Sequence, residues 1–149
     1  MRLSRQKAFL LLLVAAMGCS ETTSPKLPAT FELVNINGRP LPTYFSATPG
    51  PTSTVLSAYL LLQTDGKAFW QESRRDDAGV VTTILHDFDY TISDGRIEVG
   101  SFGPCVDCTG TYKGEVSKDA LSLVVAAFGG GGSVIYTYRT VVGIPVDQL

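Results

Sequence analysis

The 149-residue chain is poor in the side chains on which most enzymes and nucleic-acid-binding proteins depend. It has one histidine, one tryptophan and three cysteines, and only 17% of its residues are charged. Its basic residues form no block and no stripe among the aromatic residues, which argues against the electrostatic footprint of a nucleic-acid-binding protein. A Ser-His-Asp or Cys-His system would have to use His86, the single histidine. We therefore expect no catalytic activity and no cofactor.

The surroundings of His86 favour a structural role. In an extended chain it shares a face with Ile84 and Phe88, where a hydrogen-bonded histidine of the core or lumen is the commoner outcome. Asp87 and Asp89 fall on the opposite face and are typical of charges exposed to solvent. A glycosidase-like pair of carboxylates would need them on the two sides of a cleft. We assign none of these residues a catalytic role and expect no bound metal.

The apolar run near the N-terminus is too short to cross a bilayer as a helix. Residues Ala8–Gly18 hold about ten apolar positions, whereas a spanning helix needs roughly 20. Arg2, Arg5 and Lys7 precede the run, and Cys19 follows it. This order resembles the signal peptide and lipobox of bacterial lipoproteins. The resemblance implies that residues 1–18 are removed and that Cys19, carrying acyl chains such as palmitate, becomes the mature N-terminus.

Two other outcomes remain open for this segment. The small residues Ala16-Met17-Gly18 also fit ordinary signal peptidase, which would release a soluble protein, and an uncleaved segment would itself anchor the chain. Cysteine parity favours lipidation, because lipid on Cys19 leaves Cys105 and Cys108 as a pair. Ser20 is not the aspartate that retains lipoproteins in the inner membrane. We therefore expect a cell-envelope protein, lipid-anchored in the outer membrane and facing the periplasm.

The mature chain has the length of one domain. Loss of three basic residues with the signal peptide takes the net charge from −2 to about −5. Residues 19–28 are the lipidated cysteine and a flexible tether rich in Ser, Thr and Pro. The domain is expected over residues 29–142, followed by a tail over residues 143–149.

From residue 29 onward the chain alternates between β-rich runs and turns. Asn37-Gly38, Asp65-Gly66 and Asp94-Gly95 are strong turn dipeptides, and residues 39–51, with four prolines, are predicted to form an irregular loop. The pattern predicts strands near residues 31–36, 54–64, 67–74, 80–92, 96–102, 110–116, 121–128 and 134–142. About eight strands with turns every eight to twelve residues favour a closed antiparallel barrel or a sandwich, and we see no amphipathic helix.

The opening Phe31-Glu32-Leu33-Val34-Asn35-Ile36-Asn37-Gly38-Arg39-Pro40-Leu41-Pro42, with the hairpins that follow, resembles the lipocalin-like small barrels of short bacterial lipoproteins. The resemblance implies an all-β, antiparallel up-and-down β-barrel of about eight strands. It also implies a non-enzymatic binding or structural role at the cell envelope, with a small apolar ligand or a protein partner. We expect a monomer.

A small barrel either fills its interior with side chains or holds one small ligand. Even-numbered residues of 80–92 are nearly all apolar, aromatic or histidine, so we expect that face to point inward. Candidate residues for lining a lumen or ligand are Trp70, His86, Phe88, Tyr90, Tyr136 and Tyr138.

Cys105 and Cys108 lie between two predicted strands rather than at the start of a helix, which favours a structural disulfide that closes a tight loop. Zinc or copper binding would need two further ligands. The run Pro104-Cys105-Val106-Asp107-Cys108 also resembles the Pro-Cys-x-x-Cys element of the NlpE-like copper-resistance lipoproteins. That resemblance implies the alternative function, an envelope thiol-redox or metal-responsive sensor.

Overall fold

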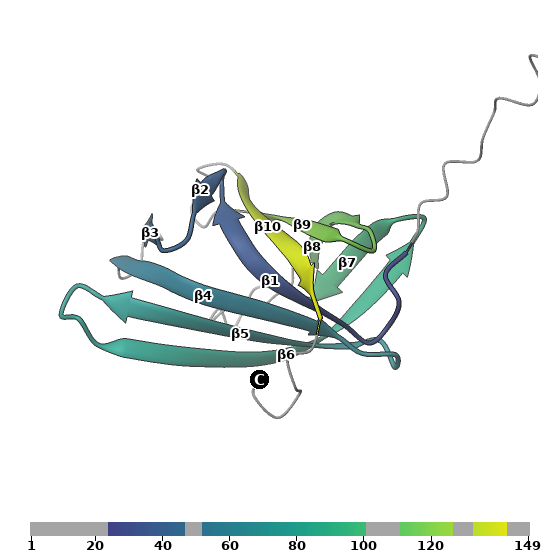
Figure 1. Ribbon diagram of the computed structural model, residues 1–149, viewed down its shortest axis with the longest axis horizontal. Helices are drawn as coiled ribbons and strands as arrows, with labels where there is room; N and C mark the ends of the chain where they lie inside the picture. Colours follow the sequence, from purple (N-terminus) through teal and green to yellow (C-terminus); the bar gives the residue numbers. More distant parts are fainter. Residues whose placement is uncertain (1–23, 47–51, 101–110, 127–132, 143–149) are drawn as a thin grey trace, which may run out of the picture.

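The computed structural model describes residues 24–46, 52–100, 111–126 and 133–142. These residues form an all-β fold in which every strand pair is antiparallel (Figure 1). The strands are β1 (Ala29–Ile36), β2 (Arg39–Pro40), β3 (Thr43–Ser46), β4 (Thr52–Leu62), β5 (Lys67–Asp76), β6 (Val81–Ser93), β7 (Arg96–Gly100), β8 (Thr111–Val116), β9 (Ala120–Ala126) and β10 (Ser133–Val141).

Eight of these strands close into an up-and-down barrel. From β4 to β10 each strand pairs with the next along the chain, and β1 joins the two ends by pairing with both β10 and β4. The closure runs through Thr30, which lies opposite Val141 of β10 and Leu61 of β4. The predicted closed antiparallel barrel is confirmed.

The strand from Val81 to Ser93 is the longest and forms one continuous element, not two. Figure 1 shows that β4, β5 and β6 lie side by side and extend at the left beyond β1 and β10. Register shifts at Val34 in β1 and Leu56 in β4 mark β-bulges. Bulges bend a strand and increase its twist, which helps the sheet to close.

The prediction of an irregular loop over residues 39–51 is wrong in part. Two short strands lie within it: β2 pairs with the end of β1, and β3 pairs with the start of β4. Residues 29–32 of β1 pair with residues 59–62 of β4. The rest of β1 and the rest of β4 do not pair with each other, so each strand has an edge that needs another partner. Strands β2 and β3 form backbone hydrogen bonds along those edges. The local proline pattern could not predict these pairings, because they depend on how β1 and β4 are placed in the barrel.

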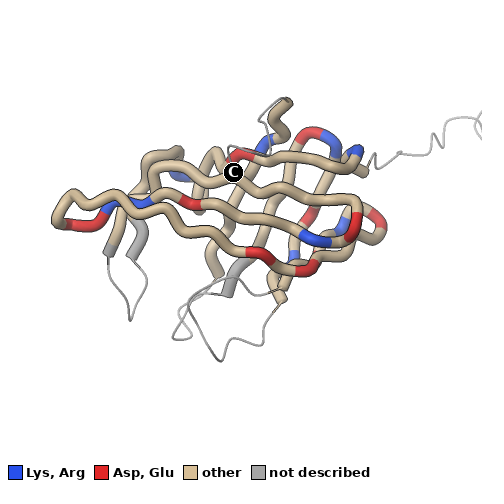
Figure 2. Tube along the Cα trace, turned by 90° about the horizontal axis from the view of Figure 1, so that it is seen from below, with Lys and Arg blue, Asp and Glu red and all other residues tan. Residues whose placement is uncertain are grey.

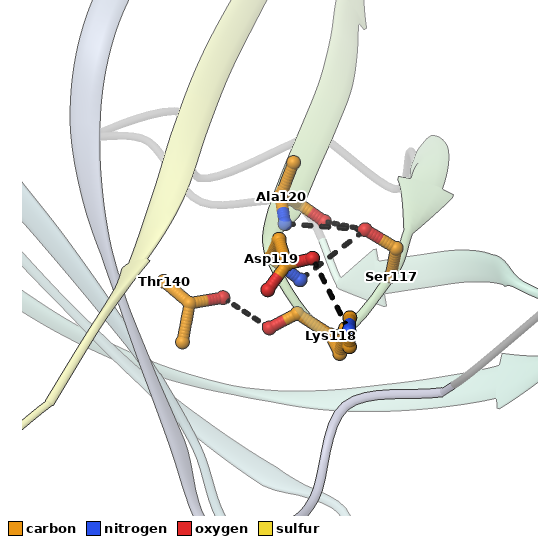
Figure 3. Close-up of polar contacts among 5 residues, drawn as sticks. All are labelled: Ser117, Lys118, Asp119, Ala120 and Thr140. Carbon is orange, nitrogen blue, oxygen red and sulfur yellow. Dashed lines mark hydrogen bonds and ion pairs between the residues drawn. The ribbon is translucent and has the colours of Figure 1, made fainter.

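Turn chemistry matches the predicted dipeptides. Asn37 and Gly38 have φ of 51° and 75°, and Asp94 and Gly95 have φ of 52° and 73°. Positive φ at both central positions is the geometry of a two-residue hairpin turn. The short turn from Ser117 to Ala120 is held differently (Figure 3).

In that turn, the Ser117 hydroxyl accepts a hydrogen bond from the Ala120 amide at 3.2 Å. The Thr140 hydroxyl on β10 donates to the Lys118 carbonyl at 2.6 Å, as Figure 3 shows, and the Thr140 amide donates to the Asp119 carbonyl. These bonds fix the β8–β9 turn to the end of β10. This end of the barrel is therefore held by side-chain hydrogen bonds as well as by the backbone hydrogen bonds between strands.

One apolar cluster fills the barrel. Its members come from the inward-facing positions of all eight barrel strands and are Ala29, Phe31, Leu33, Ile36, Val55, Ala58, Leu60, Leu62, Ala68, Trp70, Phe88, Tyr90, Ile97, Val99, Tyr112, Val116, Leu121, Leu123, Tyr136 and Tyr138. Alternation separates core from surface along most of these strands, as the period of two requires. In β1 and β4 it does not, because Thr30 and Leu61 are buried as well as their neighbours.

Candidate functional site

The inward face of β6 agrees with the sequence expectation over most of its length. Phe88 and Tyr90 are buried and Ile84 and His86 are half-buried, whereas every odd-numbered residue from 81 to 91 is exposed. At the start of the strand the separation fails, because Thr82 is also exposed. This part of β6 belongs to the hairpin end that extends beyond the rest of the barrel.

The six candidate lining residues separate into core residues and one half-buried residue. Tyr136 and Tyr138 on β10 and Trp70, Phe88 and Tyr90 on β5 and β6 belong to the hydrophobic core. His86 is half-buried, and its ring stacks on that of Trp70 with the centroids 5.6 Å apart and the planes 21° apart. The stack follows from the register, because Trp70 and His86 are directly opposite each other on neighbouring strands.

A charged pair that was not predicted from the sequence lies on the inward face of β5. Glu72 is fully buried, and its Oε1 accepts a hydrogen bond from the Nε of Arg74, which is half-buried. Its Oε2 has no hydrogen-bond partner among the described residues. Glu72 shares its face with Ala68 and Trp70, so two charges on an otherwise apolar face were the signal that could have found the pair.

Burial governs the titration of the groups around this pair. It lowers the pKa of Arg74, an effect that the nearby Tyr136 opposes. It raises the pKa of Tyr136 and of Tyr138, whose hydroxyl interacts with the side chain of Trp70. Both tyrosines therefore stay protonated at neutral pH. The inner face combines an ion pair with neutral hydroxyl groups.

A cavity of about 380 Å³ lies against the opposite, outward face of the long strands. Two neighbouring rows supply its lining: Leu61, Phe69 and Asp87 are paired across β4, β5 and β6, and Gln71 is paired with Leu85. The full lining is Leu61, Gln63, Phe69, Trp70, Gln71, Leu85, His86 and Asp87. Apart from Trp70 and His86, the lining residues have odd numbers. The core residues of β5 and β6 have even numbers, so the cavity lies on the outward face.

The apolar side chains of this cavity differ in exposure. Leu61 is only 3% exposed, whereas Phe69 is 42% and Leu85 is 65% exposed. The Oε1 atom of Gln71 is buried and has no hydrogen-bond partner among the described residues. A second, smaller cavity of about 270 Å³ adjoins the first through Leu61 and Gln63 and continues to Pro28, Thr64 and Asp65. The cavity thus combines an apolar surface with a few polar side chains.

Several predicted site residues lie outside the described residues. These are the lipidation residue Cys19 and the pair Cys105 and Cys108, so lipidation and the disulfide stay predictions. Within the described ranges, no group of three or more His, Cys, Asp or Glu side chains is arranged to hold a metal ion. Those ranges also contain no helix long and apolar enough to span a membrane.

Comparison of the chain with known protein families, with curated proteins and with solved structures finds no match.

Proposed function

We propose that this protein is a non-enzymatic binding protein of the cell envelope, anchored by lipid on Cys19, that holds a small apolar ligand against the outward face of β4, β5 and β6. The observation that carries the proposal is the cavity of about 380 Å³. Ligand pockets commonly have volumes of about 300–1,000 Å³ and are lined mainly by apolar side chains with a few polar groups. Leu61, Phe69 and Leu85 supply such a lining.

The location of the cavity differs from the lumen site that a small barrel suggests. Trp70, Tyr136 and Tyr138 are packed in the core, and each is at most 5% exposed. A packed interior leaves the outward face as the better-supported place for a ligand. The core then acts as the rigid support on which the three long strands present their outward side chains.

Trp70 provides the readout for a binding experiment. It is the only tryptophan of the chain and lines the cavity, so a ligand bound there is expected to change its fluorescence. Titration of the full mature domain with 1-octanol, an apolar chain with a small neutral head, is expected to change the Trp70 emission with saturation. An emission change that stays linear up to the solubility limit of 1-octanol would contradict the proposal.

Two matched variants locate the binding. Leu85→Asn removes an exposed apolar side chain from the cavity and should weaken 1-octanol binding by about fourfold, since each methylene group removed from water contributes about 0.8 kcal/mol. Val124→Asn removes an exposed apolar side chain from β9, 41% exposed against 65% for Leu85 and away from the cavity lining, and should leave binding unchanged. Equal effects of the two substitutions would place the ligand elsewhere.

A further inference from the structure

Two of the polar residues of the outward cavity, Gln71 and Asp87, offer hydrogen-bond acceptors to a ligand. The Oε1 of Gln71 is buried there without a hydrogen-bond partner among the described residues. Asp87 adds a carboxylate beside Phe69, its partner in the β5–β6 ladder. A buried acceptor costs free energy unless a donor reaches it. A ligand that fits this cavity therefore needs a donor at one end.

Charge around the cavity selects the kind of donor. Asp65 lines the adjoining smaller cavity, and Asp89 follows Asp87 on the same face of β6. Lys67 lies beside these acidic residues and forms an ion pair with Asp89, in which Nζ and Oδ1 are 2.6 Å apart. Among the described residues Asp87 forms no ion pair. Figure 2 shows that several acidic positions lie at the right-hand side of the barrel, with basic positions among them.

The titration of Lys67 is consistent with this negative potential. Its hydrogen bond to Asp89 raises its pKa above the ordinary 10.5, and the charges of Asp89, Asp65 and Asp87 act in the same direction. A second cation brought to Asp87 would meet the same field. An anion would be repelled by the carboxylates of Asp87, Asp65 and Asp89.

We propose that the ligand of this cavity is a small amphipathic cation, an apolar chain or ring with a protonated amine. The apolar part would lie on Leu61, Phe69 and Leu85, and the ammonium group would donate to the Asp87 carboxylate and to the Oε1 of Gln71. This assignment rests on the proposed function, because it names the ligand class of the same cavity.

Three probes with one common chain test the ligand class. Octylammonium, 1-octanol and octanoate differ only in the head group, and each is titrated below its aggregation concentration with Trp70 emission as readout. Octylammonium is expected to bind about fivefold more tightly than 1-octanol, because an ion pair with an exposed carboxylate contributes up to about 1 kcal/mol. Octanoate is expected to bind most weakly. The advantage of octylammonium should shrink in high salt, since exposed charges are screened.

Asp87→Asn and Asp89→Asn form the matched pair of variants. Both residues are exposed on the same face of β6, but only Asp87 lines the cavity. Asp87→Asn should reduce octylammonium binding about fivefold to the level of 1-octanol, whereas Asp89→Asn should leave the preference in place. Both variants are expected to fold, which thermal melting checks.

The outcomes separate the two proposals. Equal saturable binding of all three probes would overturn the cationic ligand class and leave the proposed apolar site standing. Tighter binding of octanoate, or a preference for octylammonium that survives Asp87→Asn, would also overturn it. Absence of saturable binding by every probe would remove the proposed function itself.

Discussion

Asn37, in the turn after β1, and Ile135, on the neighbouring strand β10, are joined by two hydrogen bonds. The Asn37 amide donates to the Ile135 carbonyl at 2.8 Å, and the Ile135 amide donates to the Oδ1 of Asn37, also at 2.8 Å. The β1–β2 turn is thus tied to β10 by a backbone bond and a side-chain bond, at a residue whose φ is positive.

Replacement of Asn37 should therefore cost stability through two separable effects. Asn37→Ala removes the side-chain acceptor and leaves an alanine at positive φ, a conformation that asparagine tolerates better than alanine. We therefore expect a loss of about 2 kcal/mol in the free energy of unfolding. Asn37→Gly removes the side-chain acceptor but has no Cβ to make positive φ unfavourable, so it should lose only about 1 kcal/mol in the free energy of unfolding. Urea denaturation of the two variants measures the difference, and identical losses would show that positive φ is not a cost here.

Gly114 tests how closely β8 approaches β9. A Cβ built on it would lie 1.8 Å from the Ser122 carbonyl oxygen, a distance that requires the backbone to move. Gly114→Ala is expected to destabilise the protein by about 1–3 kcal/mol, the usual range for overpacking. Gly100→Ala is the control, because its Cβ would meet Phe88 at an ordinary 3.5 Å. A neutral Gly114→Ala in thermal melting would mean that the two strands are further apart than described.

Stability should fall in strong alkali because of the buried tyrosines. Burial raises the pKa of Tyr136 and Tyr138 above the ordinary 10.0. Above about pH 10 the unfolded chain loses these protons while the folded chain keeps them. The contribution to stability is therefore complete below about pH 10 and decreases as the pH rises toward the folded pKa, by up to about 1.4 kcal/mol per pH unit for each tyrosine.

Urea denaturation between about pH 8 and pH 11 measures this dependence. Tyr138→Phe removes one of the tyrosines whose pKa is raised by burial, so the decline above about pH 10 should be less steep in the variant than in the parent protein. A decline of the same steepness in both proteins would show that Tyr138 does not titrate differently in the folded and unfolded chains.

The proposed lipid anchoring rests on Cys19. Cys19→Ala should abolish membrane association of the exported protein, because the buried acyl chains, at about 0.8 kcal/mol per methylene group, are the anchor. Membrane fractionation with detergent extraction measures it. A Cys19→Ala protein that still sediments with membranes would point to an uncleaved N-terminal segment as the anchor.

The sequence predicted the elements whose causes are local. The turns at Asn37-Gly38, Asp65-Gly66 and Asp94-Gly95 and the inward face of Phe88 and Tyr90 follow from residue type and alternation, and the structure has them. Strands β2 and β3 were missed because they exist only to complete edges of β1 and β4, which are far apart in sequence.

The candidate site was harder to predict for the same reason. Trp70 and His86 were selected as aromatic inward-facing residues, but the cavity is formed mainly by outward side chains such as Phe69 and Leu85. Alternation assigns those positions to solvent and does not reveal that the rows of β4, β5 and β6 bring them together. The buried Glu72 was missed because a charge in a strand is normally assigned to the surface.

Amide chemical shifts of the isotope-labelled mature domain locate the bound ligand on the fold. Saturating octylammonium should shift the amide resonances of Phe69, Gln71, Leu85 and Asp87 and leave those of Leu123 and Tyr138 in place. Shifts confined to Leu123, Tyr136 and Tyr138 would place the ligand inside the barrel and contradict the outward site.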